Sequence, residues 1–138
     1  MSLSFTHLGT GSRGNATLVE SGDTKILIDQ GFSGKQLETR LARMEIKPNE
    51  IDAIVLSHHH GDHGGGAAIA ERRWNTPVYC NNRTALALNL DLRNVQLFEN
   101  LEALNFADDF ALLPVPVPHS GADNVGFIVS HKGVRGAV

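Results

Sequence analysis

The stretch that decides the fold is IVLSHHHGDHGGG, residues 54–66, in which a short apolar run ends abruptly in polar residues. Four histidines and one aspartate occupy positions 58–63. Alternate side chains of an extended strand point the same way, so His58 and His60 can converge on one ion while His59 points elsewhere. The cluster is internal and interrupted, unlike an expression tag, and a solvated loop would not favour this spacing. The stretch therefore predicts a metal site at the end of a buried strand.

Asp62 and His63 follow where the chain turns, and their side chains can reach a second position close to the first. Imidazole and carboxylate ligands suit zinc and also manganese or iron. We therefore expect Zn²⁺, with Mn²⁺ or Fe as alternatives. Protein nitrogen and oxygen ligands with one position open to water are typical of a catalytic centre, not of a structural one.

The rest of the chain predicts a single domain of α/β (α+β) class. Ser33 and Gln36 form a capping-box pattern at the start of an amphipathic segment, which predicts a helix over residues 33–44. Further helices are predicted at residues 64–74 and 83–90, and strands at residues 3–9, 16–21, 25–30, 53–57, 76–80, 95–99, 110–119 and 124–131. This order predicts a mixed sheet with helices against one face, in one domain over residues 1–138.

Two further features are expected to be structural. GTGSRG, residues 9–14, matches the glycine pattern of dinucleotide-binding loops, but an alternating β pattern follows it where a helix is required. We interpret it as a tight turn between two strands. Cys80, the single cysteine, lies in an apolar run and is expected to be a buried, inert thiol.

The composition excludes some function classes. Hydrophobic residues make up 41% of the chain and charged residues 20%, with a net charge of −3. The slight negative charge and the lack of basic runs count against a nucleic-acid-binding module without chemistry. No apolar run reaches membrane length, and the N-terminus does not resemble a signal peptide. We therefore expect no membrane contact and a cytoplasmic location.

Three motifs together resemble the metallo-β-lactamase superfamily of metallohydrolases. They are SHHHGDHGGG (residues 57–66), ILIDQG (residues 26–31) and PHSGADNVGFIV (residues 118–129). The stretches GTGSRGNATLVE and DQGFSGKQLETRL look most like the YycJ (WalJ)-like exonuclease and phosphodiesterase branch. The resemblance runs over essentially the whole chain and implies an αβ/βα sandwich built from two similar halves.

The resemblance also assigns roles to individual residues. The first metal would be held by His58, His60 and His119, and Asp62 and His63 would contribute to a second metal. Asp29 would lie beneath the cluster and orient the ligands by hydrogen bonds.

The family pattern includes parts that this sequence does not contain. A bridging aspartate in a T-D-x-G-like stretch and a later histidine would follow the final GVRGAV. We therefore expect the N-terminal half of a metallohydrolase, with one intact metal site and an incomplete second one. Half a sandwich exposes an apolar sheet face, so we also expect a homodimer that pairs those faces.

The resulting expectation is a metal-dependent hydrolase of phosphodiester bonds, with a nucleic acid or a small phosphodiester as substrate. A metal-activated water would attack, and Asp62 would orient it or act as general base. Two alternatives stay open. The chain is a metal-binding half-domain with impaired catalysis, or it hydrolyses a thioester or lactam as other members of the superfamily do.

Overall fold

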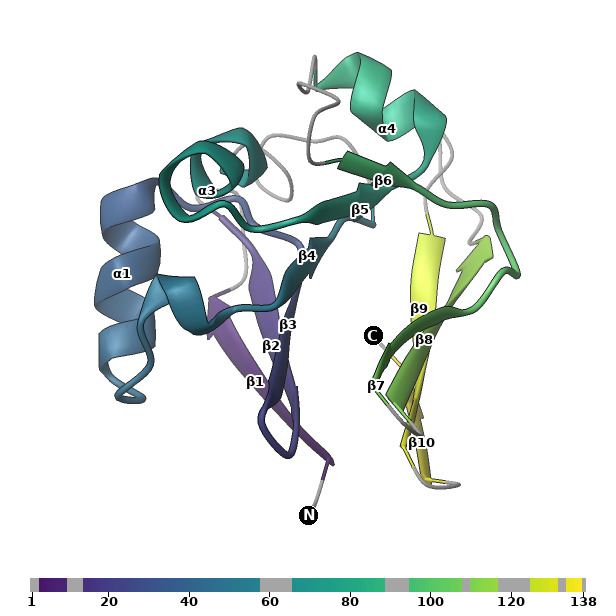
Figure 1. Cartoon of the computed structure of the whole chain (residues 1–138), viewed down its shortest axis with the longest axis horizontal. Coiled ribbons are helices and arrows are strands. Elements are labelled where there is room, and N and C mark those ends of the chain that lie inside the picture. Colours follow the sequence, from purple (N-terminus) through teal and green to yellow (C-terminus); the bar gives the residue numbers. More distant parts are fainter. Residues whose placement is uncertain are drawn as a thin grey trace.

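Two β-sheets pack face to face, and helices cover the outer face of the larger sheet (Figure 1). The structure is a computed structural model that describes residues 3–9, 14–57, 66–88, 95–107, 110–116, 125–131 and 134–137. The larger sheet has the strand order β1-β2-β3-β4-β5-β6. Its strands are β1 (Leu3–Gly9), β2 (Ala16–Ser21), β3 (Thr24–Ile28), β4 (Ala53–Val55), β5 (Val78–Cys80) and β6 (Val95–Leu97).

The larger sheet is mixed, as the sequence predicts. The strands β1, β2 and β3 form an antiparallel meander, and β3, β4, β5 and β6 run parallel. All three residues of β4 are buried, which is expected for a strand covered on both faces. The carboxyl ends of the four parallel strands therefore meet at one edge of the sheet, where ligands bind in open α/β sheets.

The smaller sheet is antiparallel, with the strand order β10-β9-β8-β7. Its strands are β7 (Leu104–Ala107), β8 (Phe110–Pro116), β9 (Val125–His131) and β10 (Val134–Ala137). The predicted pairing of the two C-terminal apolar segments is confirmed by the register between β8 and β9, in which Leu112 lies opposite Val129. Strand β7 was not predicted from the sequence.

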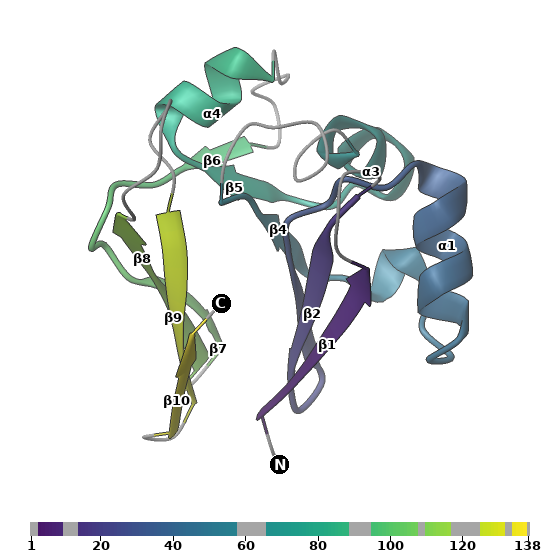
Figure 2. The same ribbon diagram turned by 180° about the vertical axis from the view of Figure 1, so that it is seen from behind.

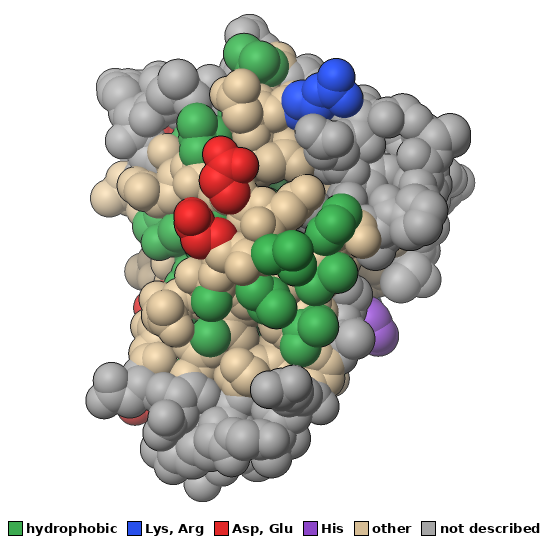
Figure 3. Space-filling view, turned by 90° about the vertical axis from the view of Figure 1, so that its right-hand side faces the viewer, with side chains coloured by type: hydrophobic (Ala, Val, Ile, Leu, Met, Phe, Trp, Pro, Cys, Tyr) green, Lys and Arg blue, Asp and Glu red, His purple; other side chains and the backbone are tan. Residues whose placement is uncertain are grey.

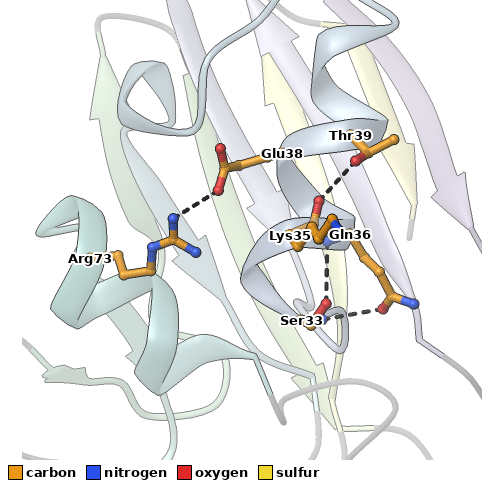
Figure 4. A network of polar contacts seen from close by, with 6 residues as sticks. All are labelled: Ser33, Lys35, Gln36, Glu38, Thr39 and Arg73. Atoms are coloured by element: carbon orange, nitrogen blue, oxygen red, sulfur yellow. Dashed lines mark hydrogen bonds and ion pairs between the residues drawn. The ribbon is translucent and has the colours of Figure 1, made fainter.

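In the described part of the chain, three helices follow strands of the larger sheet: α1 (Gly34–Ala42), α3 (Ala67–Trp74) and α4 (Asn82–Ala87), with a short 3₁₀ turn at η1 (Pro48–Glu50). The predicted capping box of α1 is confirmed, because the Ser33 hydroxyl accepts from the Gln36 backbone and the Gln36 side chain accepts from the Ser33 backbone (Figure 4). Leu37 and Leu41 are buried beneath α1. An ion pair of 2.9 Å between Arg73 and Glu38 joins α3 to α1.

The alternation of side chains along the strands divides the buried apolar residues into two clusters. Leu18, Leu27 and Ile54 pack under the helices. Their neighbours on the opposite face of the larger sheet pack against Phe110, Leu112, Phe127 and Val129 of the smaller sheet. Aromatic rings of the two sheets pack edge-to-face between them; the centroids of Tyr79 and Phe106 are 5.2 Å apart.

The two sheets lie opposite each other in Figures 1 and 2, and they also approach each other at their edge strands β1 and β10. A Cβ placed on Gly136 would lie 2.9 Å from the ring of Phe5, so glycine permits this close approach. Among the described residues, no helix is long and apolar enough to cross a membrane.

Candidate metal centre

The chain reaches the predicted metal-binding stretch along the carboxyl ends of β3 and β4. Ile28 and Val55 pair in register at these ends, and the backbone N–H of Asp29 donates to the carbonyl oxygen of Val55 at 2.8 Å. Leu56 continues the strand by donating to the carbonyl oxygen of Tyr79 at 2.8 Å. Ser57, the residue before the histidine cluster, is therefore fixed in place beside Asp29.

The Asp29 carboxylate holds Ser57 through three hydrogen bonds. The Ser57 backbone N–H donates to Oδ1 at 2.8 Å, and the Ser57 hydroxyl lies 2.9 Å from Oδ1 and 2.7 Å from Oδ2. Asp29 is 7% exposed and Ser57 9%, so these bonds lie away from bulk water. Asp29 has a φ of 68°, in the left-handed region that aspartate tolerates better than most residues. This conformation ends β3 at Ile28, two residues before the predicted strand end.

The other end of the histidine stretch is held by the next residues after Asp29. The backbone N–H of Gly66 donates to the carbonyl oxygen of Gln30 at 2.8 Å. The Gln30 side chain is fully buried; it donates to the carbonyl oxygen of Phe32 at 2.8 Å and accepts from the Phe32 N–H at 3.2 Å. A Cβ on Gly66 would lie 2.1 Å from that Phe32 oxygen, so only glycine fits. Residues 29–32 thus fix both ends of the stretch.

The two ends of the glycine-rich segment, residues 9–14, lie close to the segment that follows β3. Cβ atoms placed on Gly9 and Gly14 would lie 2.7 Å and 2.6 Å from the ring of Phe32. Gly14 also has a φ of 148°, and the neighbouring Asn15 accepts a hydrogen bond from Gly31 at 3.1 Å. A strand, not a helix, follows the segment, as predicted, so it does not form a dinucleotide-binding turn.

The predicted metal ligands His58, His60, Asp62, His63 and His119 lie outside the described residues. Among the described residues, no group of three or more histidine, cysteine, aspartate or glutamate side chains is placed to hold a metal ion. The described frame does fit a metal centre, because the buried Asp29 carboxylate and the backbone carbonyl of the buried Gln30 fix the two ends of a segment that contains four histidines and an aspartate. Preorganisation of this kind is what metal ligands require.

The last predicted ligand, His119, lies in the sequence between the end of β8 and the start of β9. The N–H of Leu101, after β6, donates to the carbonyl oxygen of Pro114 at 2.7 Å, and the Phe98 ring packs edge-to-face on Phe127. β8 therefore ends, and β9 begins, on the side of the sandwich where β6 ends (Figure 1). Residues 117–124, which connect these two strands and include His119, lie outside the described part of the chain.

Cys80 at the end of β5 is buried, as predicted, and burial raises the pKa of its thiol to about 12. The raised pKa keeps the thiol protonated at neutral pH, which fits the expected inert thiol.

Comparison with known proteins decides the family. The profile described as Metallo-beta-lactamase superfamily matches residues 9–136. The chain belongs to the metallo-β-lactamase superfamily. The exodeoxyribonuclease YycJ of Bacillus anthracis is 35% identical over 95 residues, which cover 69% of this chain and 36% of that protein. The exodeoxyribonuclease WalJ of Streptococcus pneumoniae serotype 2 (strain D39 / NCTC 7466) is 32% identical over 111 residues, covering 75% of this chain and 41% of that protein.

A UPF0173 metal-dependent hydrolase of Archaeoglobus fulgidus is 30% identical over 88% of this chain and 56% of its own length. The chain thus spans about half, or less, of the curated relatives it matches. Solved metallo-β-lactamases share the fold: MEM-A1, a subclass B3 enzyme from a soil metagenome library, superposes with a TM-score of 0.77 at 21% identity, over 97% of this chain and 58% of that chain. The expected metallo-β-lactamase fold is therefore confirmed, and the superfamily implies a divalent metal.

The resemblance pointed to Asp29, whose role in orienting metal ligands stays a prediction. The sequence did not single out four other residues that hold the frame: Ser57, Gln30, Phe32 and Gly66. The sequence marks these residues only weakly, because it does not reveal which backbone groups approach each other.

Proposed function

We propose that this member of the metallo-β-lactamase superfamily provides the metal-binding part of a hydrolase that cleaves phosphodiester bonds, with a nucleic acid strand as substrate. One observation carries the proposal: at the carboxyl ends of the parallel strands, Asp29 binds Ser57 and Gln30 binds Gly66, so both ends of the histidine stretch are held in place. The names of two relatives, both exodeoxyribonucleases, support the substrate class.

In this proposal His58, His60 and His119 hold a first divalent ion, Zn²⁺ or alternatively Mn²⁺ or Fe, and Asp62 and His63 contribute to a second position. When bound, such an ion would lower the pKa of a water to about 7, so that hydroxide is available as the nucleophile at neutral pH. Asp62 orients this water or takes its proton. Asp29 acts one step removed: its carboxylate fixes Ser57, and Ser57 fixes where the histidine stretch begins.

The alternative is a metal-binding domain with impaired catalysis. The chain spans from 36% to 56% of the three curated relatives compared above. Both proposals require metal binding, so turnover separates them.

The test measures bound metal by elemental analysis and turnover of single-stranded DNA and of bis-p-nitrophenyl phosphate by the same preparation. The hydrolase proposal expects turnover that is lost in His58→Ala and His60→Ala and kept in His7→Ala. His7 is a suitable control because it is exposed on β1 and its Nδ1 lies 2.9 Å from the Thr17 hydroxyl, in the described part of the chain. Bound metal without turnover supports the alternative, and a protein without either contradicts both.

We also propose a homodimer through the outer face of the smaller sheet. Ala111, Leu113, Val115 and Ile128 alternate with the buried residues of β8 and β9 and are only half-buried. Figure 3 shows apolar side chains gathered on this face. A second copy of the face would cover it.

A further inference from the structure

A basic pocket of about 270 Å³ lies along α1, outside the candidate metal centre. Its lining residues come from successive turns of this one helix: Lys35, Gln36, Thr39, Arg40 and Arg43. Sites for drug-sized ligands have volumes of about 300–1,000 Å³. This pocket therefore suits a small charged group, not a whole cofactor.

The charge of the pocket is opposite to that of the chain. Three of its lining residues are cations and none is a carboxylate, although the chain has a net charge of −3. The nearest acidic residue on the helix surface, Glu38, is directed toward Arg73 of α3 and pairs with it (Figure 4). The first turn of α1 carries no acidic residue, so the positive end of the helix dipole adds to the charge of Lys35.

Arg40 connects the pocket to the frame of the metal centre. Its guanidinium carbon lies 4.3 Å from the centroid of the Phe32 ring, and Nη1 donates to the carbonyl oxygen of Leu8 at 2.5 Å. Phe32 belongs to the segment that fixes both ends of the histidine stretch. The pocket thus lies on the flank of the sheet edge where the proposed centre is built.

The two outer cations lie at opposite ends of α1. Lys35 lies in the first turn of α1 and Arg43 follows its last residue, so the two Cα atoms are separated by about 12 Å along the helix axis. Both residues are exposed. A nucleic acid strand that lies along α1 would meet cations at both ends of this helix.

We propose that this pocket binds the phosphodiester backbone of a nucleic acid strand, one or more nucleotides away from the bond that is cleaved. The inference rests on the proposed function, and it adds a contact that holds a long substrate and that a small phosphodiester does not reach. Lys35 and Arg43 supply the phosphate contacts, and Arg40 positions the pocket against Phe32 and β1.

The test uses the double variant Lys35→Ala/Arg43→Ala, which leaves Arg40 and its structural contacts in place. The control, Lys47→Ala/Arg72→Ala, removes the same charge from two other exposed positions. Binding of a fluorescein-labelled single-stranded phosphorothioate oligonucleotide, which resists cleavage, is measured by fluorescence anisotropy over a series of salt concentrations. Circular dichroism verifies that all three proteins are folded.

We expect the pocket variant to bind the strand roughly tenfold more weakly, with a salt slope shallower by about 1 to 2. The control should keep the slope of the unmodified protein. Turnover of bis-p-nitrophenyl phosphate should be the same in all three proteins. An unchanged slope in the pocket variant overturns the proposal, as does strand binding too weak to measure in the unmodified protein. Strand binding that depends on the pocket, without turnover of either substrate, contradicts the proposed hydrolase and leaves the pocket supported.

Discussion

The carboxylate of Asp29 binds both the backbone N–H and the hydroxyl of Ser57, a residue 28 positions further along the chain. This relationship joins the ends of two parallel strands at the point where regular strand pairing stops. Because both residues are buried, the bonds are protected from competition by water. The start of the histidine stretch is therefore set by a side chain that is not itself a predicted ligand.

Replacing Asp29 with asparagine should loosen this contact without disturbing the backbone, since asparagine also tolerates a positive φ. We expect the loss of the charge-assisted hydrogen bonds to lower the free energy of unfolding by about 1–3 kcal/mol. Metal affinity should fall by about 10–100-fold if the contact orients the ligands. Urea denaturation and chelator competition measure the two effects.

Asp52→Asn is the matched control, because Asp52 also accepts a backbone hydrogen bond, from Lys25 at 2.8 Å, but at an exposed position. It should change stability by less than about 1 kcal/mol and leave metal affinity unchanged. Equal metal affinity in Asp29→Asn and the unmodified protein would contradict a positioning role for Asp29.

Replacing Gly66 with alanine should displace the far end of the histidine stretch. The new Cβ would lie 2.1 Å from the Phe32 carbonyl oxygen and 2.4 Å from Gln30 Nε2, both of which are fixed by hydrogen bonds. Overpacking of this kind costs about 1–3 kcal/mol. We expect lower stability by thermal denaturation together with a lower metal content by elemental analysis.

Gly34→Ala tests whether any added methyl has this effect. Its Cβ would meet the end of the flexible Arg73 side chain at 2.6 Å, and that side chain can move. Alanine also favours a helix over glycine by about 1 kcal/mol. Gly34→Ala should therefore keep its metal, and equal metal loss in both variants would show that the close approach at Gly66 is unimportant.

The sequence predicted those parts of the fold that depend on local signals. The capping box at Ser33 and the apolar stripe of Leu37 and Leu41 specify α1 without reference to the rest of the chain. Strand β7, Leu104–Ala107, was missed because its four residues are neither continuously apolar nor bounded by a clear turn. The second sheet packed on the first depends on long-range pairing, which periodicity alone does not specify.

The candidate site was predictable to a similar extent. The spacing of the histidines indicates ligands, and the resemblance located Asp29. The contact from Gly66 to Gln30 joins backbone groups far apart in the sequence, and no side-chain pattern marks it. The ligand roles of His58, His60, Asp62, His63 and His119 stay predictions, since these residues lie outside the described part of the chain.

The buried Cys80 predicts how stability changes at alkaline pH. Burial raises the pKa of its thiol from 9.0 to about 12, whereas the thiol of the unfolded chain ionises near its ordinary value. Above pH 9 the unfolded state therefore loses a proton that the folded state keeps. The contribution of this group to stability is complete below pH 9 and is lost between pH 9 and about 12, at up to about 1.4 kcal/mol per pH unit.

Cys80→Ala should remove this part of the pH dependence. The difference in free energy of unfolding between the unmodified protein and the variant, measured by urea denaturation, should therefore narrow as the pH rises above 9. A thiol reagent such as DTNB should react slowly with the native protein and completely after unfolding. Fast reaction of the native protein at pH 8 would contradict the buried, protonated state.

The apolar face on the smaller sheet predicts the oligomeric state. Leu113 and Ile128 lie opposite each other in the register between β8 and β9, at the centre of this face. A charged residue there would be desolvated in a face-to-face dimer but would remain hydrated in a monomer. Leu113→Glu should therefore convert a dimer into a monomer in light scattering, with native circular dichroism. Thr39→Glu, an exposed change on α1 at the far side of the larger sheet, should leave the dimer intact. A monomeric unmodified protein that stays in solution at high concentration would show that a second copy does not cover this face.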